Sequence, residues 1–444
     1  LRSRGFHRQL PNTNSPIGFP ARIIISMAHH KTQGKQNPQR IATETVKILQ
    51  DAGFEAFFAG GCVRDQIMGN SPEDYDIATS ARPEKVLQLF PRSARVGAAF
   101  GVVMVRLHGR SMEVATFRSD GVYSDGRRPD SVAFTTAEHD AQRRDFTCNG
   151  LFFDPVANDL IDYVNGQADI RAKILRAIGD PAQRFREDHL RMMRAIRFAA
   201  RLGFTIEPAT WAAICDNAER LPDISRERIG QELRKILLHP QRQVGAQWLI
   251  LSGLLNSFWP LHHVANSPTI ALPRLSALPK TISFPAALAA LMIDLDNSAL
   301  HDPTIISNQI ASLQTSLALS GMETQCATWL LMNLPVLENW HSTRLASLKR
   351  LLAHAWSDDL LMLYAAEHAA DEKAALLAKR IAELKTQPLA PDRLVNGDDL
   401  IAMGAQPGPL FKEWLEELYD RQLENEFPDR PSALQAAKSL LLRT

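Results

Sequence analysis

The chain has 444 residues, of which 45% are hydrophobic and 22% are charged, and its formal net charge is +1. This composition excludes a disordered chain, leaves room for roughly two to four domains, and excludes a protein that binds polyanions through bulk charge alone. The four cysteines lie far apart and form no CxxC motif, which favours free thiols in a reducing cytoplasm.

The chain begins with a segment that lacks periodicity. Residues 1–37 are rich in Asn, Pro, Ser and basic residues and lack the order of a signal peptide, so we expect a flexible tail in which Met27 is a candidate natural start. Helical spacing then predicts a helix over residues 40–52, which Gly53 ends. The next predicted elements are a strand over 54–59, a short helix over 63–68, a strand over 75–78 and a helix over 83–90.

Two β-rich segments follow, residues 102–107 and 112–118, and the sequence HGRS between them predicts a hairpin. Residues 132–134 predict a further short strand, and after about residue 165 the β pattern ends. We therefore expect an α+β fold, with a small mixed β-sheet head followed only by helices. The expected parts are a head over 38–165, a neck over 166–230, a body over 231–390 and a tail over 391–444.

The most continuous apolar stretch, FPAALAALMI, contains a proline and is too short to span a bilayer. It predicts a buried helix over residues 284–293, and we expect no membrane segment in the chain.

Two carboxylates stand out in the head, Asp74 and Asp76. Residues i and i+2 of a strand point to the same face, so these side chains should project side by side and repel unless a cation such as Mg²⁺ neutralises them. Taken alone, a DxD motif is more simply a turn cap and a surface residue. Gly60 and Gly61 favour a metal site instead, because glycines between a strand and a helix let backbone N–H groups approach an anion such as a phosphate. Arg64 in the following turn favours an anion as well, and the combination predicts a triphosphate–metal site.

Residues 57–91, FFAGGCVRDQIMGNSPEDYDIATSARPEKVLQLFP, resemble the head of the class II nucleotidyltransferases, which comprise the tRNA CCA-adding enzymes and the bacterial poly(A) polymerases. The family pattern is GGxVRD followed by DxD. The resemblance is strong over about residues 54–206 and returns in a tail segment. Further motifs follow in family order: EVATFR (113–118), YSDGRRPDSVAF (123–134), RRDFTCNGLFFD (143–154), REDHLRMMRAIRFAARLGF (186–204) and LVNGDDLIAMGAQPGPLFKEWLEELYDRQLENEF (394–427).

The resemblance implies nucleotidyl transfer, in which the 3′-hydroxyl of an RNA attacks the α-phosphate of a nucleoside triphosphate and pyrophosphate leaves. It implies that Asp74 and Asp76 hold two Mg²⁺ ions, with Glu113 either a third carboxylate or an exposed strand residue. The triphosphate would lie against Gly60, Gly61, Arg64 and Arg144. The loop over residues 123–129 would be mobile and needed for adding A after CC, unless it is an ordinary linker.

In the neck, the resemblance assigns nucleotide binding to four residues, Asp188, Arg191, Arg194 and Arg197. A continuous helix over 186–201 would place Asp188 and Arg191 on one face, three residues apart. Asp188 as acceptor and Arg191 as donor could together receive cytosine or adenine, as a Watson–Crick partner would. The alternative is a surface salt bridge between the two. Arg197 falls within an apolar stripe, so it needs an anionic partner; the stripe is Leu190, Met193, Ile196 and Ala200.

One stretch departs from many bacterial relatives, which carry a metal-dependent His-Asp phosphohydrolase domain in the body. In LAALMIDLDN (288–297), Ile293 stands where the histidine would precede Asp294. The doublet His262-His263 is nearby but is a common surface or core feature. We expect a degenerate His-Asp-like region without a working metal centre.

The interpretation that fits best is a cytoplasmic tRNA nucleotidyltransferase that adds CCA to tRNA from CTP and ATP. One alternative is a poly(A) polymerase, which typically has a Gly-Arg-Arg-Phe-Arg-like segment where this chain has VGAAFGVVMV (96–105). Others are an enzyme that adds only the terminal A and a non-catalytic RNA-binding protein, against which the intact Asp74, Asp76 and Arg191 argue. RNA contacts should be mostly with phosphate and shape, and the basic stretch over 231–243 is one candidate.

Overall fold

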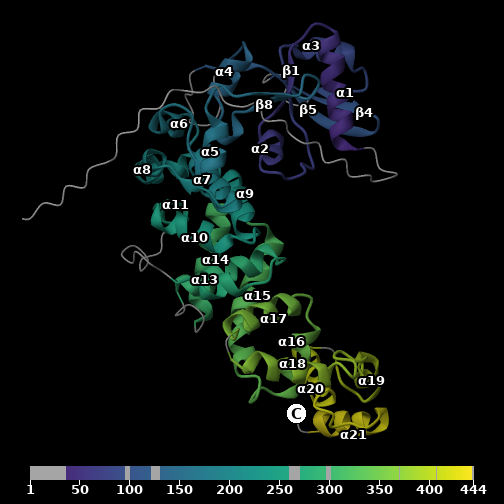
Figure 1. Cartoon of the computed structure of the whole chain (residues 1–444). Coiled ribbons are helices and arrows are strands. Elements are labelled where there is room, and N and C mark those ends of the chain that lie inside the picture. Colours follow the sequence, from purple (N-terminus) through teal and green to yellow (C-terminus); the bar gives the residue numbers. More distant parts are fainter. Residues whose placement is uncertain are drawn as a thin grey trace, which may run out of the picture. The chain divides into compact units, whose positions relative to one another are not determined.

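The computed structural model describes residues 37–95, 101–121, 131–259, 271–296, 302–369, 371–406 and 408–442 (Figure 1). The chain divides into two compact units. The first contains residues up to Thr116 together with Phe152–Ile161, and the second contains Phe117–Leu151 and Asp162–Thr444. Within the described ranges, no helix is both long enough and apolar enough to cross a membrane.

A seven-stranded sheet forms the centre of the first unit, in the order β3-β4-β5-β2-β1-β8-β9. The sheet is mixed, because β2 and β5 run parallel while the other neighbours pair antiparallel. This confirms the mixed sheet expected of the head. The strands are β1 (Ala56–Ala59), β2 (Ile77–Thr79), β3 (Ala94–Arg95), β4 (Val102–Leu107), β5 (Arg110–Thr116), β8 (Phe152–Asp154) and β9 (Asp159–Ile161).

Three helices belong to the same unit: α1 (Pro38–Asp51), α2 (Gly61–Ile67) and α3 (Pro83–Leu89). The Asn37 side chain caps α1 by accepting from the N–H of Gln39 at 3.0 Å. The buried face of α1 packs against the sheet, as its residues Ile41, Ala42, Thr45, Val46 and Leu49 recur at helical spacing.

The predicted hairpin joins β4 to β5. Leu107 pairs with Arg110, which leaves His108 and Gly109 as a two-residue loop with φ values of 48° and 78°. Positive φ at both central positions is what a tight hairpin requires, because that backbone matches the twist of the strands. The sequence HGRS therefore forms the turn that it predicts.

Two predicted elements differ from the structure. The strand expected over 75–78 begins at Ile77, so Asp74 and Asp76 precede β2 rather than lie in it. The single helix expected over 186–201 is two helices, α6 (Pro181–Glu187) and α7 (Leu190–Leu202). Asp188 separates them with an extended backbone (φ −146°, ψ 103°), and its side chain accepts from the N–H of Leu190 at 3.1 Å at the start of α7.

The second unit is mostly helical, and Figure 1 labels most of its helices. Two small ladders interrupt the helices: β6 (Arg118–Asp120) with β7 (Val132–Phe134), and β10 (Ile174–Leu175) with β11 (Thr205–Ile206). The second ladder lies beyond residue 165, where we expected helices only. It forms because β11 directly follows the end of α7 and pairs with β10, a segment about thirty residues earlier in the chain.

The helices of this unit besides α6 and α7 have the following bounds: α4 (Ala137–Gln142), α5 (Gly166–Ala172), α8 (Pro208–Asn217), α9 (Arg226–Leu237), α10 (Arg242–Leu251), α11 (Leu254–Phe258), α12 (Pro273–Ala277), α13 (Phe284–Leu295), α14 (Pro303–Leu317), α15 (Gly321–Glu338), α16 (Leu345–Ala353), α17 (Ser357–Glu367), α18 (Lys373–Leu384), α19 (Gly397–Ala402), α20 (Pro409–Leu423) and α21 (Arg430–Leu441).

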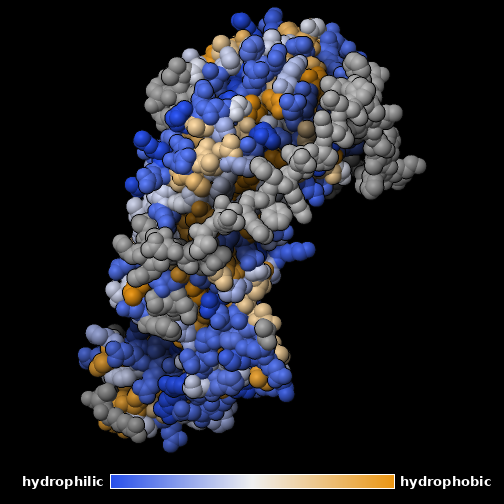
Figure 2. Space-filling view, turned by 60° about the vertical axis from the view of Figure 1, so that its left-hand side comes forward, coloured by the Kyte–Doolittle hydropathy of each residue, from blue (hydrophilic) through white to orange (hydrophobic). Residues whose placement is uncertain are grey.

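Helix α13 is the predicted buried helix, and its residues from Ala286 to Ile293 are all buried. It packs against α9, α12, α15 and α17, so apolar residues are needed on every side of it. The C-terminal helices have a core of their own, formed by Val395, Leu400, Leu418, Ala433 and Ala437. On the face of the molecule shown in Figure 2, hydrophilic residues predominate and hydrophobic ones appear in small groups between them.

Candidate active site

The glycine turn joins β1 to α2. Gly60 has φ 73°, a conformation that L side chains rarely adopt, and Gly61 begins the helix. Arg64 follows in the first turn of α2 and is 3% exposed, and its guanidinium binds the carboxylate of Asp65 at 2.7 Å. Arg64 is therefore a buried arginine of the turn. A plain tight turn would instead have left this side chain in solvent.

Asp74 and Asp76 lie directly before β2. Both are exposed, while Tyr75 and Ile77 are 7% and 1% exposed, so the chain alternates sides as an extended segment does. The two carboxylates therefore point to the same side, as predicted from their spacing. The backbone carbonyl of Asp76 accepts from the N–H of Ala59 at 2.9 Å, which attaches this segment to the end of β1.

The sheet register brings a third carboxylate near the pair. Ile77 of β2 pairs with Val114 of β5, so the preceding residues Asp76 and Glu113 lie at the same level of parallel strands. Glu113 is exposed, like the two aspartates. Exposed carboxylate oxygens at this edge suit a hard divalent cation, which needs oxygen ligands from one or two carboxylates and from substrate phosphates.

Arg143 and Arg144 open the third motif, and both bind Asp140, at 2.7 and 2.9 Å. Burial raises the pKa of the Asp140 carboxyl, but the Arg144 and Arg143 guanidiniums outweigh it and hold this pKa below its usual range. The role of Asp140 was not predicted from the sequence, although its spacing of four residues from Arg144, just beyond the end of α4, was the available signal. The two arginines are thus oriented by α4, which supplies the carboxylate.

Asp145, the next residue of the motif, binds Arg194 of α7 at 2.6 Å and accepts from the Asn149 amide at 3.1 Å. Burial raises the pKa of Asp145, and the Arg194 guanidinium more than offsets this and lowers it. The pair connects the motif over 143–154 to the neck helix. The sequence pointed to Arg194 but not to this partner.

Asp188 and Arg191, the proposed base-reading pair, each have a different ion-pair partner. Asp188 binds Arg228 of α9, with Nη2 to Oδ2 at 2.8 Å and Nη1 to Oδ1 at 3.3 Å. Arg191 binds Glu187 at 2.6 Å and donates to the carbonyl of Arg184 at 3.0 Å. The surface salt bridge considered for this pair is replaced by these two contacts, because the chain bends at Asp188.

Arg197 is 9% exposed and binds Glu232 of α9, which is 3% exposed, at 2.5 Å. This confirms that an arginine within the apolar stripe needs an anionic partner. Burial lowers the pKa of Arg197. The sequence held a signal for the partner, because Glu232 lies on the buried face of α9 between Ile229, Leu233 and Ile236.

The structure places the predicted site residues in two groups. The first unit carries Gly60, Gly61, Arg64, Asp74, Asp76 and Glu113, and the second carries Arg144, Asp188, Arg191, Arg194 and Arg197. Within each group the residues lie on connected elements. The loop over 123–129 and residues 96–100 of the stretch VGAAFGVVMV lie outside the described residues.

The body shows what Asp294 does in this chain. Its carboxylate accepts from the N–H groups of Arg274 and Leu275, at 3.2 and 2.9 Å, at the start of α12, and it binds the Arg274 guanidinium at 3.3 Å. Ile293 beside it is 2% exposed. Across the described residues, no three His, Cys, Asp or Glu side chains are grouped to hold a metal ion, and the doublet at 262–263 lies outside them.

Comparison with known proteins gives consistent matches. Residues 56–176 match the family described as the poly A polymerase head domain, and residues 203–265 match a probable RNA and SrmB-binding site of polymerase A. A CCA-adding enzyme of Levilactobacillus brevis is 35% identical over 417 residues, which cover 89% of this chain and 96% of that protein. One of Limosilactobacillus fermentum is 35% identical over 406 residues, covering 88% and 95%.

Solved structures agree with these matches. The crystal structure of the Bacillus stearothermophilus CCA-adding enzyme in complex with CTP has a TM-score of 0.76 and is 29% identical, covering 92% of this chain and all of that one. A Thermotoga maritima CCA-adding enzyme complexed with tRNA has a TM-score of 0.64 at 19% identity, covering 90% and 95%, and so shares the fold.

Proposed function

The chain belongs to the CCA-adding enzymes, and we propose that it adds C and A, from CTP and ATP, to the 3′ ends of tRNA without a nucleic-acid template. The observation that carries this proposal is the likeness to CCA-adding enzymes over 89% of the chain. Relatives that match over nearly the whole length are CCA-adding enzymes, so poly(A) synthesis is not favoured. The activity belongs in the cytoplasm, which agrees with cysteines that lie far apart in the sequence and form no CxxC motif.

In this proposal the carboxylates of Asp74 and Asp76 form the catalytic centre. They bind the divalent metal, which we propose to be two Mg²⁺ ions. Both side chains are exposed on one side of an extended segment, so both can reach a substrate phosphate. Mg²⁺ bound there supplies charge neutralisation at the transferring phosphate and a more acidic 3′-hydroxyl. Glu113 lies at the level of Asp76 on the neighbouring strand, where it can supply a third carboxylate to the site.

The triphosphate is held by the glycine turn and by arginines. The turn at Gly60 and Gly61 exposes backbone N–H groups, and Arg64 contributes a guanidinium that is already fixed by Asp65. Arg144 is likewise fixed by Asp140, so little side-chain entropy remains to be lost when it binds a phosphate or ribose. Arg194 and Arg197 serve the site by orienting α7 through Asp145 and Glu232.

Base selection rests on Asp188 and Arg191. The Asp188 carboxylate offers about four lone-pair sites, so the bonds from Arg228 and Leu190 leave room for an amino donor of a base. Arg191 has five N–H donors; Nη1 donates to Glu187 and to the Arg184 carbonyl, and Nη2 donates to the Arg143 carbonyl at 3.5 Å. Cytosine and adenine present an amino donor beside a ring acceptor, whereas uracil and guanine present a carbonyl where Asp188 needs a donor.

The test is incorporation into tRNA that lacks its 3′ end, with Mg²⁺ and with CTP and ATP separately and together. We expect C from CTP alone and the complete CCA from the mixture. A long A tract from ATP alone would instead indicate a poly(A) polymerase. Incorporation of A only onto tRNA that already ends in CC would indicate an enzyme restricted to the terminal A.

A further inference from the structure

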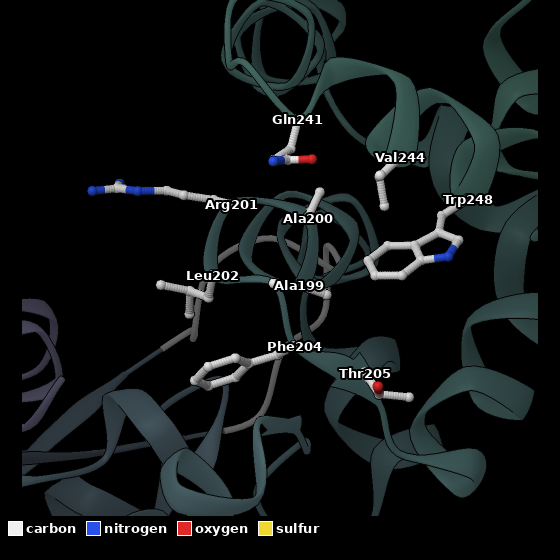
Figure 3. Close-up of a pocket in the computed structure, with 10 residues that line it drawn as sticks. Ala199, Ala200, Arg201, Leu202, Phe204, Thr205, Gln241, Val244 and Trp248 are labelled. Carbon is white, nitrogen blue, oxygen red and sulfur yellow. The ribbon is translucent and has the colours of Figure 1, made fainter. Parts of the chain in front are cut away.

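The C-terminal end of α7, the residues that follow it up to Thr205, and one side of α10 line a pocket of about 470 Å³ that none of the roles above uses (Figure 3). All of its lining residues belong to the second unit, so its shape depends on that unit alone. Arg191 and Arg201 are ten residues apart on α7, which corresponds to about 15 Å along a helix axis. The pocket is therefore separate from the base-reading pair at the start of α7.

One side of the pocket is flat and apolar. The indole of Trp248 projects into it from α10, toward the small side chains of Ala199 and Ala200 on α7 (Figure 3). Trp248 is only half-buried, so part of its side chain remains accessible to a ligand. An aromatic face beside a floor of small residues is the surface on which a planar heterocycle stacks.

The edges of the pocket offer hydrogen-bonding groups. The amide of Gln241 lies at one edge and the hydroxyl of Thr205 at another (Figure 3). The last carbonyls of a helix lack intrahelical partners. At the end of α7, the N–H groups of Gly203 and Phe204 donate to the carbonyls of Ala200 and Ala199, respectively. The carbonyls of Arg201 and Leu202 thus remain as acceptors for the amino groups of a base.

The rim is positively charged. The lining residues include no acid, and within the described part of the chain no carboxylate lies within ion-pair distance of Arg201. Figure 3 shows its guanidinium extending outward on the side opposite Trp248. Burial lowers the pKa of nearby His239, and the Arg201 and Arg242 cations lower it further, as expected for a locally positive potential.

We propose that this pocket binds one unpaired nucleotide of the tRNA substrate, with the base stacked on Trp248 and an adjoining backbone phosphate on Arg201. A planar apolar wall, hydrogen-bonding edges and a cation that has no carboxylate partner among the described residues together match a nucleotide. Thr205, Gln241 and Trp248 also fall within the segment that matches an RNA-binding family. The inference rests on the proposed function, because it takes tRNA to be the substrate.

The experiment measures tRNA affinity and the KM values for tRNA and CTP with tRNA lacking its 3′ end. We expect Arg201→Glu and Trp248→Leu each to weaken tRNA binding by about tenfold, the scale of one stacked base or one phosphate contact. Trp248→Phe, which keeps an aromatic face, should stay within about threefold of the wild type. The KM for CTP should not change, because the pocket lies away from Asp188 and Arg191.

Arg110→Glu provides the matched control, since it applies the same charge change at an exposed arginine in the hairpin of the first unit. Thermal melting of each variant separates loss of a contact from loss of the fold. Unchanged tRNA affinity in Arg201→Glu or in Trp248→Leu overturns the proposal, and this is also the result expected if the pocket receives a peptide of a protein partner. Failure of the wild type to extend tRNA would overturn the proposed function, while the binding measurement would still decide the role of the pocket.

Discussion

Arg228 holds the carboxylate of Asp188 with two hydrogen bonds, at 2.8 and 3.3 Å, although the two residues are forty positions apart. The same carboxylate accepts from the N–H of Leu190 at the start of α7, so Arg228 orients the acceptor that we propose to read the base. We therefore predict that a residue outside the motifs of the neck affects nucleotide choice.

Replacing Arg228 by alanine should therefore weaken base discrimination, although Arg228 itself does not contact the base in this proposal. We expect the KM for CTP and ATP to rise by about fivefold to about a hundredfold, because a charge-assisted hydrogen bond contributes about 1–3 kcal/mol and about 1.4 kcal/mol is tenfold. Steady-state incorporation measures this. Arg226→Ala on the same helix is the control, since Arg226 is exposed and two residues away. Equal effects of the two substitutions would contradict a specific role for Arg228.

Asp188→Ala should relax the choice of base itself. UTP and GTP should be incorporated better relative to CTP and ATP. In the wild type, a base carbonyl facing the Asp188 carboxylate leaves both groups unpaired at a cost of about 1–3 kcal/mol per group, and this penalty is absent from the variant. Single-nucleotide incorporation with each of the four triphosphates gives the ratios. If the variant keeps the wild-type preference and loses only thermal stability, Asp188 is a helix cap and an ion-pair partner, and base selection lies elsewhere.

Asp74→Asn and Asp76→Asn should each reduce incorporation by at least about a thousandfold, because each replaces a carboxylate proposed to bind Mg²⁺ by a neutral amide. Binding of tRNA should remain within about twofold, since it depends on phosphate contacts elsewhere. Glu73→Gln is a matched control, as Glu73 is an exposed acid directly before Asp74. Near-wild-type turnover in either aspartate variant would show that the metal assignment is wrong.

The contact between α9 and α14 depends on Gly230. A Cβ at this position would lie 2.1 Å from the carbonyl oxygen of Leu317, which is backbone and cannot turn aside. Gly230→Ala should lower the free energy of unfolding by about 1–3 kcal/mol, the usual cost of overpacking. Urea unfolding measures it. Gly321→Ala in α15 is the control, because a Cβ there meets no atom within 4 Å, and it should be neutral.

His368 provides a pH-dependent contribution to stability. Its ring nitrogens bind Glu338 at 2.7 Å and Asp371 at 2.9 Å. Burial lowers the pKa of His368, but hydrogen bonds to Asp371 and Glu338 outweigh it and raise this pKa above 6.5. The charged form is therefore favoured in the folded state. The stabilisation is fully present below the unfolded pKa and is lost as pH rises through the folded pKa.

Urea unfolding of the wild type and His368→Gln at several pH values between about 5.5 and 9 tests this, since the unfolded pKa of histidine is about 6.5. The difference in free energy of unfolding between the two proteins should be largest at the acidic end and should shrink as pH rises. The same substitution at His139, an exposed histidine on α4, should leave the pH profile unchanged. A difference that stays constant with pH would mean that His368 contributes only packing.

Much of the first unit could be predicted because its signals are local. The hairpin at His108-Gly109, the glycine turn at Gly60 and the common side of Asp74 and Asp76 each follow from backbone preferences or from the period of two in an extended chain. The predicted start of β2, residue 75, differs from the observed start at Ile77 by two residues. The difference arises because the alternation of exposed and buried side chains continues through residues 74–76, which form no ladder pairs. The break at Asp188 was missed because an aspartate can continue a helix or cap the next one, and the residues alone do not decide between these roles.

The sequence by itself therefore determined the family motifs, the α+β order and the residue types of the candidate site. Only the tertiary structure decided their partners: Arg228 for Asp188, Glu232 for Arg197 and Asp145 for Arg194. These partners lie 35 to 49 residues away along the chain. Periodicity shows which face of an element is buried, but the packing of α7 against its neighbours determines which charged group lies opposite on that face.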